Sequence, residues 1–272
     1  MKPNIFTRKF FGIAVAILVV GLAYTSQAAQ QGVGRVIKLQ GAARYSSGNN
    51  VWLPVTVGTV LKPGSVVQTA SESWVDIVLS GEGDAIRPTP VVSKGPQQRV
   101  FKPNAPALQN VVRMREHTLL AIDRLSWDQT GADTVTDTQL DLRAGSIFGS
   151  VKKSSAASRY EVKLPNGVAG IRGTVYSLSV NGVLTVYSGS VVATYVNPNN
   201  PNETITRVVN AGQQYDPATD KYTTVPLVGT QDAQNTADEM TQKTGTQTEK
   251  VYSPEPIVYL SPVQAGDQPS GD

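Results

Sequence analysis

The chain of 272 residues contains no cysteine and a single histidine, His117. Without cysteine there can be no disulfide, thiol nucleophile, lipid-modified cysteine or cysteine metal site. With one histidine, a metal centre would need several carboxylates around it, and a Ser-His-Asp triad would depend on His117 without a nucleophile-elbow motif to support it. A carboxylate pair suffices for glycoside hydrolysis, but 21 acids provide such pairs in any chain. We therefore expect no enzyme activity, no cofactor and no metal.

Long apolar runs are also scarce, since the chain has one, residues 10–23. Its length of 14 residues is short of the roughly 20 that a membrane-spanning helix needs. Bases without acids precede it in residues 1–9, and small residues stand where signal peptidase reads the chain, at Ser26–Ala28. This is the pattern of a secretory signal. We expect cleavage between Ala28 and Ala29 and a periplasmic or secreted chain without a membrane span, and an uncleaved anchor is the alternative.

The mature chain has no excess of basic over acidic residues. The sequence has 24 Lys+Arg and 21 Asp+Glu, and residues 1–28 hold three of the bases and none of the acids, which leaves 21 of each. The basic character therefore belongs to the export signal, so it predicts no nucleic-acid partner.

What the sequence does contain is strand patterning. From about residue 33, short runs such as RVIKL (35–39) and WVDIVL (74–79) recur with a period of two, and Gly, Pro, Asn or Ser lies in nearly every gap. This alternation is typical of an all-β protein. It predicts one β-domain over residues 29–225, built as an antiparallel sandwich or roll.

Two local patterns predict turns. Asn181-Gly182 lies between two alternating runs, the strongest short hairpin signal. A two-residue turn there would place Val180 opposite Val183, Leu178 opposite Thr185 and Tyr176 opposite Tyr187. The second pattern is an echo that places a glycine where two extended runs meet, at LKPGSV (61–66), LDLRAGSI (140–147), LTVYSGSV (184–191) and VVNAGQQY (208–215).

Five segments in chain order carry a family resemblance: WLPVTVGTVLKPGSVVQT (52–69), QLDLRAGSIFGSV (139–151), YEVKLPNGVAGIRGTVYSL (160–178), VYSGSVVATY (186–195) and VVNAGQQYD (208–216). Together they resemble the FecR-type periplasmic domain of bacterial regulators of iron-siderophore uptake, over roughly residues 32–220. The resemblance implies an all-β, jelly-roll-like domain without known catalytic activity. Membrane-bound members begin with a cytoplasmic segment that controls a sigma factor. Nine residues precede the apolar run here, so we expect the outer domain used alone.

The segment GVAGIRGT (167–174) is the most recognisable part of this resemblance. A phosphate-binding P-loop needs Gly-x-x-x-x-Gly-Lys-Ser/Thr ahead of a helix, whereas this segment has no lysine and a strand pattern follows it. Nucleotide binding is therefore not expected. We predict a structural corner made by Gly167, Gly170, Arg172, Gly173 and Thr174, with a turn at Asn166-Gly167. Arg172 would bond crowded backbone carbonyls, so Arg172→Ala would cost about 1–3 kcal/mol.

Weaker candidates for partner binding come from two places. Residues 87–115 hold five prolines, six bases and no acid, which predicts a loop outside the β-core over about residues 87–110. We expect the whole segment 87–115 to lie outside the β-core. Arg99 and Lys102 in it could bind an anionic envelope polymer, the six acids of residues 116–141 could neutralise it within the fold, or it could be a plainly solvated loop. Tyr176 and Tyr187 could form a stacking platform for a sugar, although such pairs more often only stabilise a sheet.

Residues 226–272 are polar and interrupted by proline, which predicts a largely disordered tail, although Ala233, Ala237 and Met240 allow a short marginal helix. The sequence as a whole predicts an exported, non-enzymatic FecR-like domain that binds or senses an envelope partner, either a protein or an anionic polymer. The alternatives are a structural or carbohydrate-binding β-sandwich of the envelope and an exported hydrolase.

Overall fold

The computed structural model describes residues 29–49, 51–81, 88–90, 101–103, 110–128, 135–197 and 200–241. The predicted signal peptide, with Ala28, and the chain beyond residue 241 lie outside the described residues. The described elements are β1 (Gln30–Gln40), β2 (Ala43–Ser46), β3 (Leu53–Pro54), β4 (Val60–Leu61), β5 (Val66–Thr69), β6 (Trp74–Gly81), β7 (Pro88–Pro90), β8 (Phe101–Pro103), β9 (Asn110–Met114), β10 (Leu119–Asp128), β11 (Val135–Ala144), β12 (Ser146–Ser150), β13 (Arg159–Leu164), β14 (Gly167–Ser179), β15 (Leu184–Asn197), β16 (Asn200–Asn210), β17 (Gln213–Asp216), β18 (Lys221–Thr224) and α1 (Leu227–Thr241).

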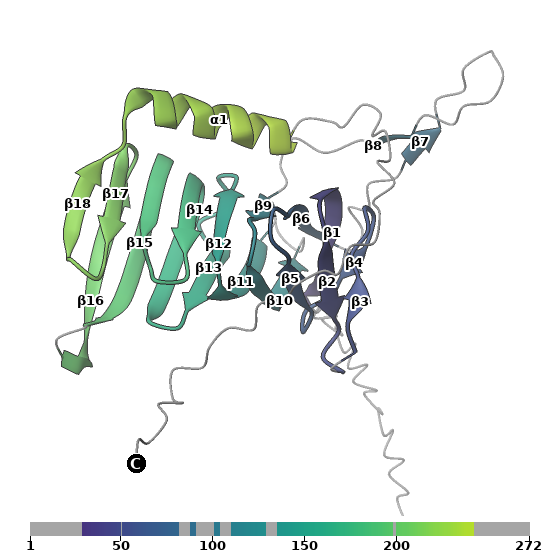
Figure 1. Ribbon diagram of the computed structural model, residues 1–272, viewed down its shortest axis with the longest axis horizontal. Helices are drawn as coiled ribbons and strands as arrows, with labels where there is room; N and C mark the ends of the chain where they lie inside the picture. The colour runs from purple at the N-terminus through teal and green to yellow at the C-terminus, as the bar shows by residue number, and fades with distance from the viewer. Residues whose placement is uncertain are drawn as a thin grey trace, which may run out of the picture.

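Eight of these strands form a closed ring of hydrogen-bonded neighbours, in the order β1-β6-β9-β12-β14-β13-β11-β10 and back to β1. Strand β14 closes it because Gly167–Gly170 pair with β13 and Val175–Ser179 pair with β12. All the ring's pairs are antiparallel except β11 with β13. Strands β15 to β18 extend the sheet on one side of the ring and β2 to β5 on the other (Figure 1). The all-β, mainly antiparallel fold predicted from the sequence is confirmed.

The alternation of side chains produces two separate apolar clusters. The larger one fills the ring, and its most buried members include Ile77, Met114, Leu140 and Tyr176. The smaller cluster lies on the outer face of β6, β9, β12 and β14, where Val78, Val111, Phe148 and Val175 contact the helix. Because successive residues of a strand point to opposite faces, Ile77 serves the first cluster and Val78 the second.

Helix α1 covers that outer face and lies along one side of the strands in Figure 1. Its buried residues are Ala233, Ala237 and Met240. These are the three positions for which the sequence allowed a short marginal helix. The structure departs from the expected disorder here, because the helix has 15 residues and is docked on the sheet. Across the described ranges, no helix is long and apolar enough to cross a membrane.

The β14–β15 hairpin turns where Asn-Gly predicts, but with a different geometry. The Gly182 amide donates to the Ser179 carbonyl over 2.9 Å, and the Ser179 amide donates to the Val183 carbonyl over 3.1 Å. The loop is therefore Val180–Gly182, with Gly182 at φ 91°. This is the three-residue loop in which a left-handed glycine follows a type I turn. A type I′ turn would need positive φ at Asn181 as well, and Asn181 does not adopt it.

The longer loop shifts the strand register by one residue. Tyr176 faces Val186 and Leu178 faces Leu184. The predicted pairs Val180–Val183, Leu178–Thr185 and Tyr176–Tyr187 are therefore wrong.

The glycine echo is confirmed as a set of corners. Gly64, Gly145 and Gly212 each connect two strands, Gly189 lies at a bend within β15, and all four have positive φ. At Gly145 an added Cβ would also lie 2.5 Å from Thr118 Oγ1. A larger residue there would meet both backbone strain and a close neighbour.

The GVAGIRGT segment forms the corner at which β14 changes neighbours. Residues Pro165–Asn166 make the turn before it, one position earlier than predicted, and Gly167 already pairs with Leu164. Gly167 allows close approach, since an added Cβ would lie 2.3 Å from the Thr194 carbonyl oxygen, whereas at Gly170 the nearest atom would be 3.6 Å away. Gly173 has φ 63°, so the chain can bend there at no steric cost.

Thr174, not Arg172, fastens this corner. Thr174 is 1% exposed, its backbone exchanges two 2.9 Å hydrogen bonds with Val151, and its hydroxyl lies 2.9 Å from the Ser190 carbonyl oxygen and 3.1 Å from that of Arg172. The Arg172 side chain is exposed and makes one 3.4 Å hydrogen bond, to the Ser154 carbonyl. The predicted structural corner is present, and Arg172 bonds one backbone carbonyl within it as predicted, but its exposure makes that bond a weaker support than those of Thr174.

We predict that Thr174→Val lowers the free energy of unfolding by about 1–3 kcal/mol, because valine keeps the shape and removes a buried hydroxyl that donates to the partly buried carbonyls of Ser190 and Arg172. Arg172→Ala should change it by less than about 0.5 kcal/mol, as an exposed substitution does. Urea unfolding of both variants measures the difference. A larger effect of Arg172→Ala than of Thr174→Val would contradict this assignment.

Candidate functional site

The tyrosine platform predicted for a sugar is not formed. Tyr176 is 0% exposed and lies inside the ring. Tyr187 lies on the other face, against Phe148, with the ring centroids 5.9 Å apart. Because the two rings occupy opposite faces of the sheet and one of them is buried, they cannot stack on a ligand together.

The basic segment 87–115 divides into two parts. Strands β7 and β8 pair only with each other, as a two-stranded sheet separate from the large one, and Lys102 belongs to β8. Arg99 lies outside the described residues. Residues 110–114 form β9, however, which pairs with β6 and β12 inside the ring. The prediction that the segment lies outside the core is therefore wrong for this last part.

The alternative that residues 116–141 neutralise the basic segment can be followed only at Arg113 and Arg115, because the side chains of its other four bases lie outside the described residues. Three of those acids pair with other bases: Asp123 with Lys163, Asp137 with Arg124 and Asp141 with Arg143. Arg113, from the basic segment, instead pairs with Asp76 and Glu239.

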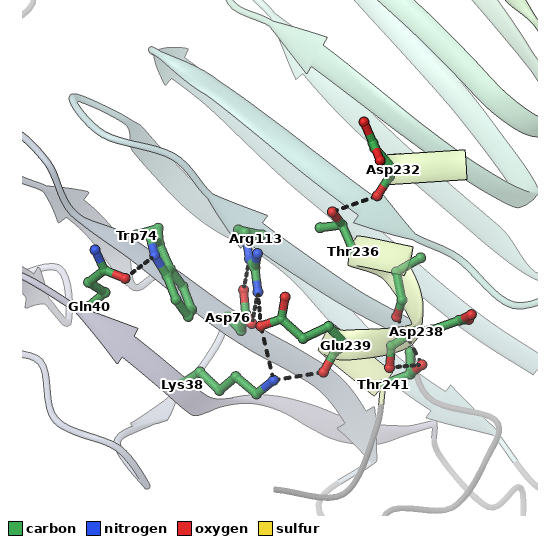
Figure 2. Close-up of polar contacts among 11 residues, drawn as sticks. Lys38, Gln40, Trp74, Asp76, Arg113, Asp232, Thr236, Asp238, Glu239 and Thr241 are labelled. Carbon is green, nitrogen blue, oxygen red and sulfur yellow. Dashed lines mark hydrogen bonds and ion pairs between the residues drawn. The ribbon is translucent and has the colours of Figure 1, made fainter. Parts of the chain in front are cut away.

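This Arg113 pair is the centre of a charged cluster that we define as Lys38, Asp76, Arg113 and Glu239 (Figure 2). Arg113 Nε lies 2.7 Å from Asp76 Oδ1 and Arg113 Nη2 lies 2.8 Å from Asp76 Oδ2. Asp76 is 0% exposed. The two residues face each other across the β6–β9 pair, so the sheet itself holds this bidentate geometry, the strongest arrangement for such a pair.

Burial governs the protonation of the pair. Removal from water raises the pKa of the Asp76 carboxyl, and the hydrogen bonds and charge of Arg113 oppose the shift. Burial alone would lower the pKa of Arg113, but its bonds to Asp76 and the charges of Asp76 and Glu239 outweigh this and raise it. A guanidinium stays protonated in proteins, so Arg113 remains a fixed positive charge.

Trp74 packs against the Arg113 guanidinium, and Gln40 in turn holds the Trp74 ring. Its guanidinium carbon lies 4.2 Å from the centroid of the Trp74 ring, a cation–π contact. The Trp74 indole N–H donates to Gln40 Oε1 over 2.9 Å. Figure 2 shows the Trp74 and Arg113 side chains next to each other on neighbouring strands.

The cluster also joins the sheet to the end of α1. Lys38 Nζ donates to the Glu239 carbonyl oxygen over 2.7 Å, and the Glu239 carboxylate lies 3.5 Å from Lys38 Nζ and 3.4 Å from Arg113 Nη2. The last carbonyls of a helix lack partners within the helix and carry partial negative charge. Since α1 has no basic residue in its last turn, Lys38 supplies that charge from the sheet.

An open pocket of about 440 Å³ lies beside this cluster and the helix. That volume falls within the usual range for binding sites, roughly 300–1,000 Å³. The pocket is lined by Gln40, Glu72, Ser73, Trp74, Arg113, Arg115, Glu116, Phe148 and Thr236. Among the described residues, the Arg115 guanidinium makes no hydrogen bond or ion pair, although its charge partly opposes the rise in the pKa of Tyr187 that burial causes. The pocket thus offers aromatic surface and a guanidinium.

The sequence reasoning missed this site. The available signal was a charged residue within an apolar β-run, as with Lys38 in RVIKL and Asp76 in WVDIVL. Such a residue faces either solvent or a buried partner, and the partner lies on a strand that the sequence alone does not place beside it.

We predict that Arg113→Ala lowers the free energy of unfolding by about 3–5 kcal/mol, because it leaves the Asp76 carboxylate buried and unpaired. The matched control is Arg124→Ala, which breaks an exposed pair with Asp137 and should cost far less, because water screens an exposed pair. Thermal and urea unfolding measure both. Equal costs for the two variants would show that the buried pair is not a main support of the fold.

Comparison with known proteins gives a match to a family model and partial matches to solved structures. Residues 107–192 match the family model described as FecR protein, and no curated protein matches the chain. Two crystal structures of a "putative anti-sigma factor" from Parabacteroides distasonis ATCC 8503 are similar, each at 11% identity over 42% of this chain, with TM-scores of 0.29 and 0.30. The matches span 49% and 50% of those chains, about half their length. The FecR resemblance indicated by the sequence is therefore confirmed, over residues 107–192.

Proposed function

We propose that this protein is an exported, non-enzymatic FecR-like domain that binds a protein partner of the cell envelope as part of envelope signalling. The FecR match over residues 107–192 supports the family and its setting. The pocket beside α1 supports binding, because it combines the Trp74 ring, the Phe148 ring and the Arg115 guanidinium. Tryptophan and arginine are enriched among the residues that dominate protein interfaces.

A protein partner fits this pocket better than the other ligands considered. The sugar-binding reading depended on Tyr176 and Tyr187, and burial of Tyr176 removes its support. For an anionic polymer, a long row of bases would be needed, whereas the described bases around the pocket are interleaved with Glu72 and Glu116. An acidic or aromatic segment of a protein matches the mixture of charge and ring surface.

Export is tested by the mature N-terminus. We predict that protein isolated from the periplasmic or external fraction begins at Ala29, because the apolar run of residues 10–23 is too short to remain as a spanning helix. N-terminal sequencing by Edman degradation or mass spectrometry gives the answer. Full-length protein confined to the membrane fraction would contradict export with cleavage.

Partner binding is tested by photo-crosslinking in the native cells. We expect Glu116→p-benzoylphenylalanine in the full chain, which labels the lining of the pocket and leaves Arg115 in place, to give one dominant adduct with an envelope protein. The same substitution at Val192, which is 49% exposed on β15, outside the pocket, should not. Adducts at both positions in equal amount, or at neither, would count against binding through this pocket.

A further inference from the structure

The outer apolar cluster is a core that exists only while α1 is in place. Its floor consists of Val78, Val111, Phe148 and Val175, with Ile37 and Tyr187 packed against it. Its cover consists of Ala233, Ala237 and Met240 from the helix. The cluster inside the ring has no member from α1. Loss of the helix would therefore expose the outer cluster and leave the cluster inside the ring intact.

We propose that this floor is a helix-binding surface of which α1 is the exchangeable resident, and that the partner occupies it with an amphipathic helix of its own. The inference rests on the proposed function, since it assigns the surface and the type of segment through which the envelope protein would bind. A helix in an apolar groove is a common mode of peptide recognition.

The helix is weakly built for a permanent core element. Its sequence includes Gly229 and Asn235 together with three threonines at 230, 236 and 241, residues with low helix propensity. It has no acid in its first turn and no base in its last, so its own charges do not stabilise its ends. Leu227 and Val228 at its start are 84% and 66% exposed. Its attachment depends on three apolar contacts and on the charged cluster.

The surface beneath α1 is held by interactions that do not involve the helix. Strands β6, β9, β12 and β14 pair with one another in register. The Asp76–Arg113 pair lies across two of them and stays satisfied without Glu239. Departure of α1 therefore leaves an ordered apolar strip with Lys38 and Arg113 at one end.

The contacts of α1 define the chemistry of a replacement. Two small residues four apart, Ala233 and Ala237, let the helix approach the sheet closely, and Met240 fills the space three residues later. Glu239 directs its carboxylate towards Lys38 and Arg113 (Figure 2). A partner helix thus needs small–x3–small–x2–apolar spacing and a carboxylate next to the last apolar residue.

The first test measures release of α1 in the full chain. The protein has no cysteine, so Ala237→Cys introduces a single thiol that is covered only by docking of the helix. Ala193→Cys, on β15 at a position 0% exposed in the larger apolar cluster, is the matched control. We expect Ala237→Cys to react with a thiol reagent at least about tenfold faster than Ala193→Cys under native conditions, because local opening needs less free energy than global unfolding. Equal rates would overturn the proposal.

The second test measures occupation of the vacated surface. Ala237→Arg in the full chain prevents docking of α1, and the probe is a fluorescent peptide of residues 227–241. We expect the peptide to bind this variant at least about tenfold more tightly than the parent, in which the tethered helix competes at millimolar effective concentration. The same peptide carrying Ala237→Arg should not bind. Equal peptide affinity for parent and variant, or no binding to either, overturns the proposal even if the Ala237→Arg chain keeps its unfolding transition.

These tests use only the chain and its own helix, so their outcome is separate from that of the envelope crosslink. A crosslink from position 116 without a peptide effect would leave the proposed function standing and refute the helix surface. Peptide binding without any crosslink would refute the envelope partner and leave α1 as a displaceable cover alone.

Discussion

Closure of the ring depends on one strand that has to serve two neighbours on the same edge. The first half of β14 pairs with β13 and its second half with β12, while β15 follows it on the other edge. A regular strand cannot change neighbours without a bend, and here both strands of the β14–β15 hairpin bend at one place. Gly173 and Gly189 both have positive φ there, and a Cβ on Gly189 would lie 2.4 Å from the Gly173 carbonyl oxygen. The glycine-rich motif is thus explained by geometry, without a phosphate.

The bend also separates the two strands that share an edge of β14. Beyond Val151 the chain leaves β14 and returns as β13, so β12 and β13 diverge into different parts of the ring. Most of the floor under the helix (Val111, Phe148, Val175 and Tyr187) lies in the segment that matches the FecR family, whereas α1 lies outside that segment. The surface under the helix thus lies mostly within the segment that matches the family model, and the helix that covers it lies outside that segment.

Strand content and corner positions could be read from the sequence because they depend on local chemistry. A period of two and recurrent glycines need no knowledge of neighbours, and the four echoed glycines all proved to be corners. The hairpin at Asn181-Gly182 shows the limit. Its place was evident, but a loop one residue longer moved Tyr187 to the other face. The same limit explains Arg172 and Thr174, since the sequence shows which side chain has more donors and not which one is buried. Distant pairs such as Asp76 with Arg113 were beyond reach, because no local signal states which strands lie side by side.

A buried ion pair on the outer face of a sheet calls for its own explanation. Replacing such a pair by apolar residues is often neutral or stabilising, so stability alone does not account for Asp76 and Arg113. Their position gives a second role. Asp76 takes two of the nitrogens of Arg113, and Arg113 Nη2 also lies 3.4 Å from the carboxylate of Glu239. An apolar pair at this point would not distinguish one apolar helix from another. The fixed guanidinium, together with Lys38, instead disfavours a helix that brings no carboxylate, because Lys38 would then lose water without an acidic partner and Arg113 would keep only Asp76. The cost of burying the pair is thus offset by selectivity in what the outer face binds.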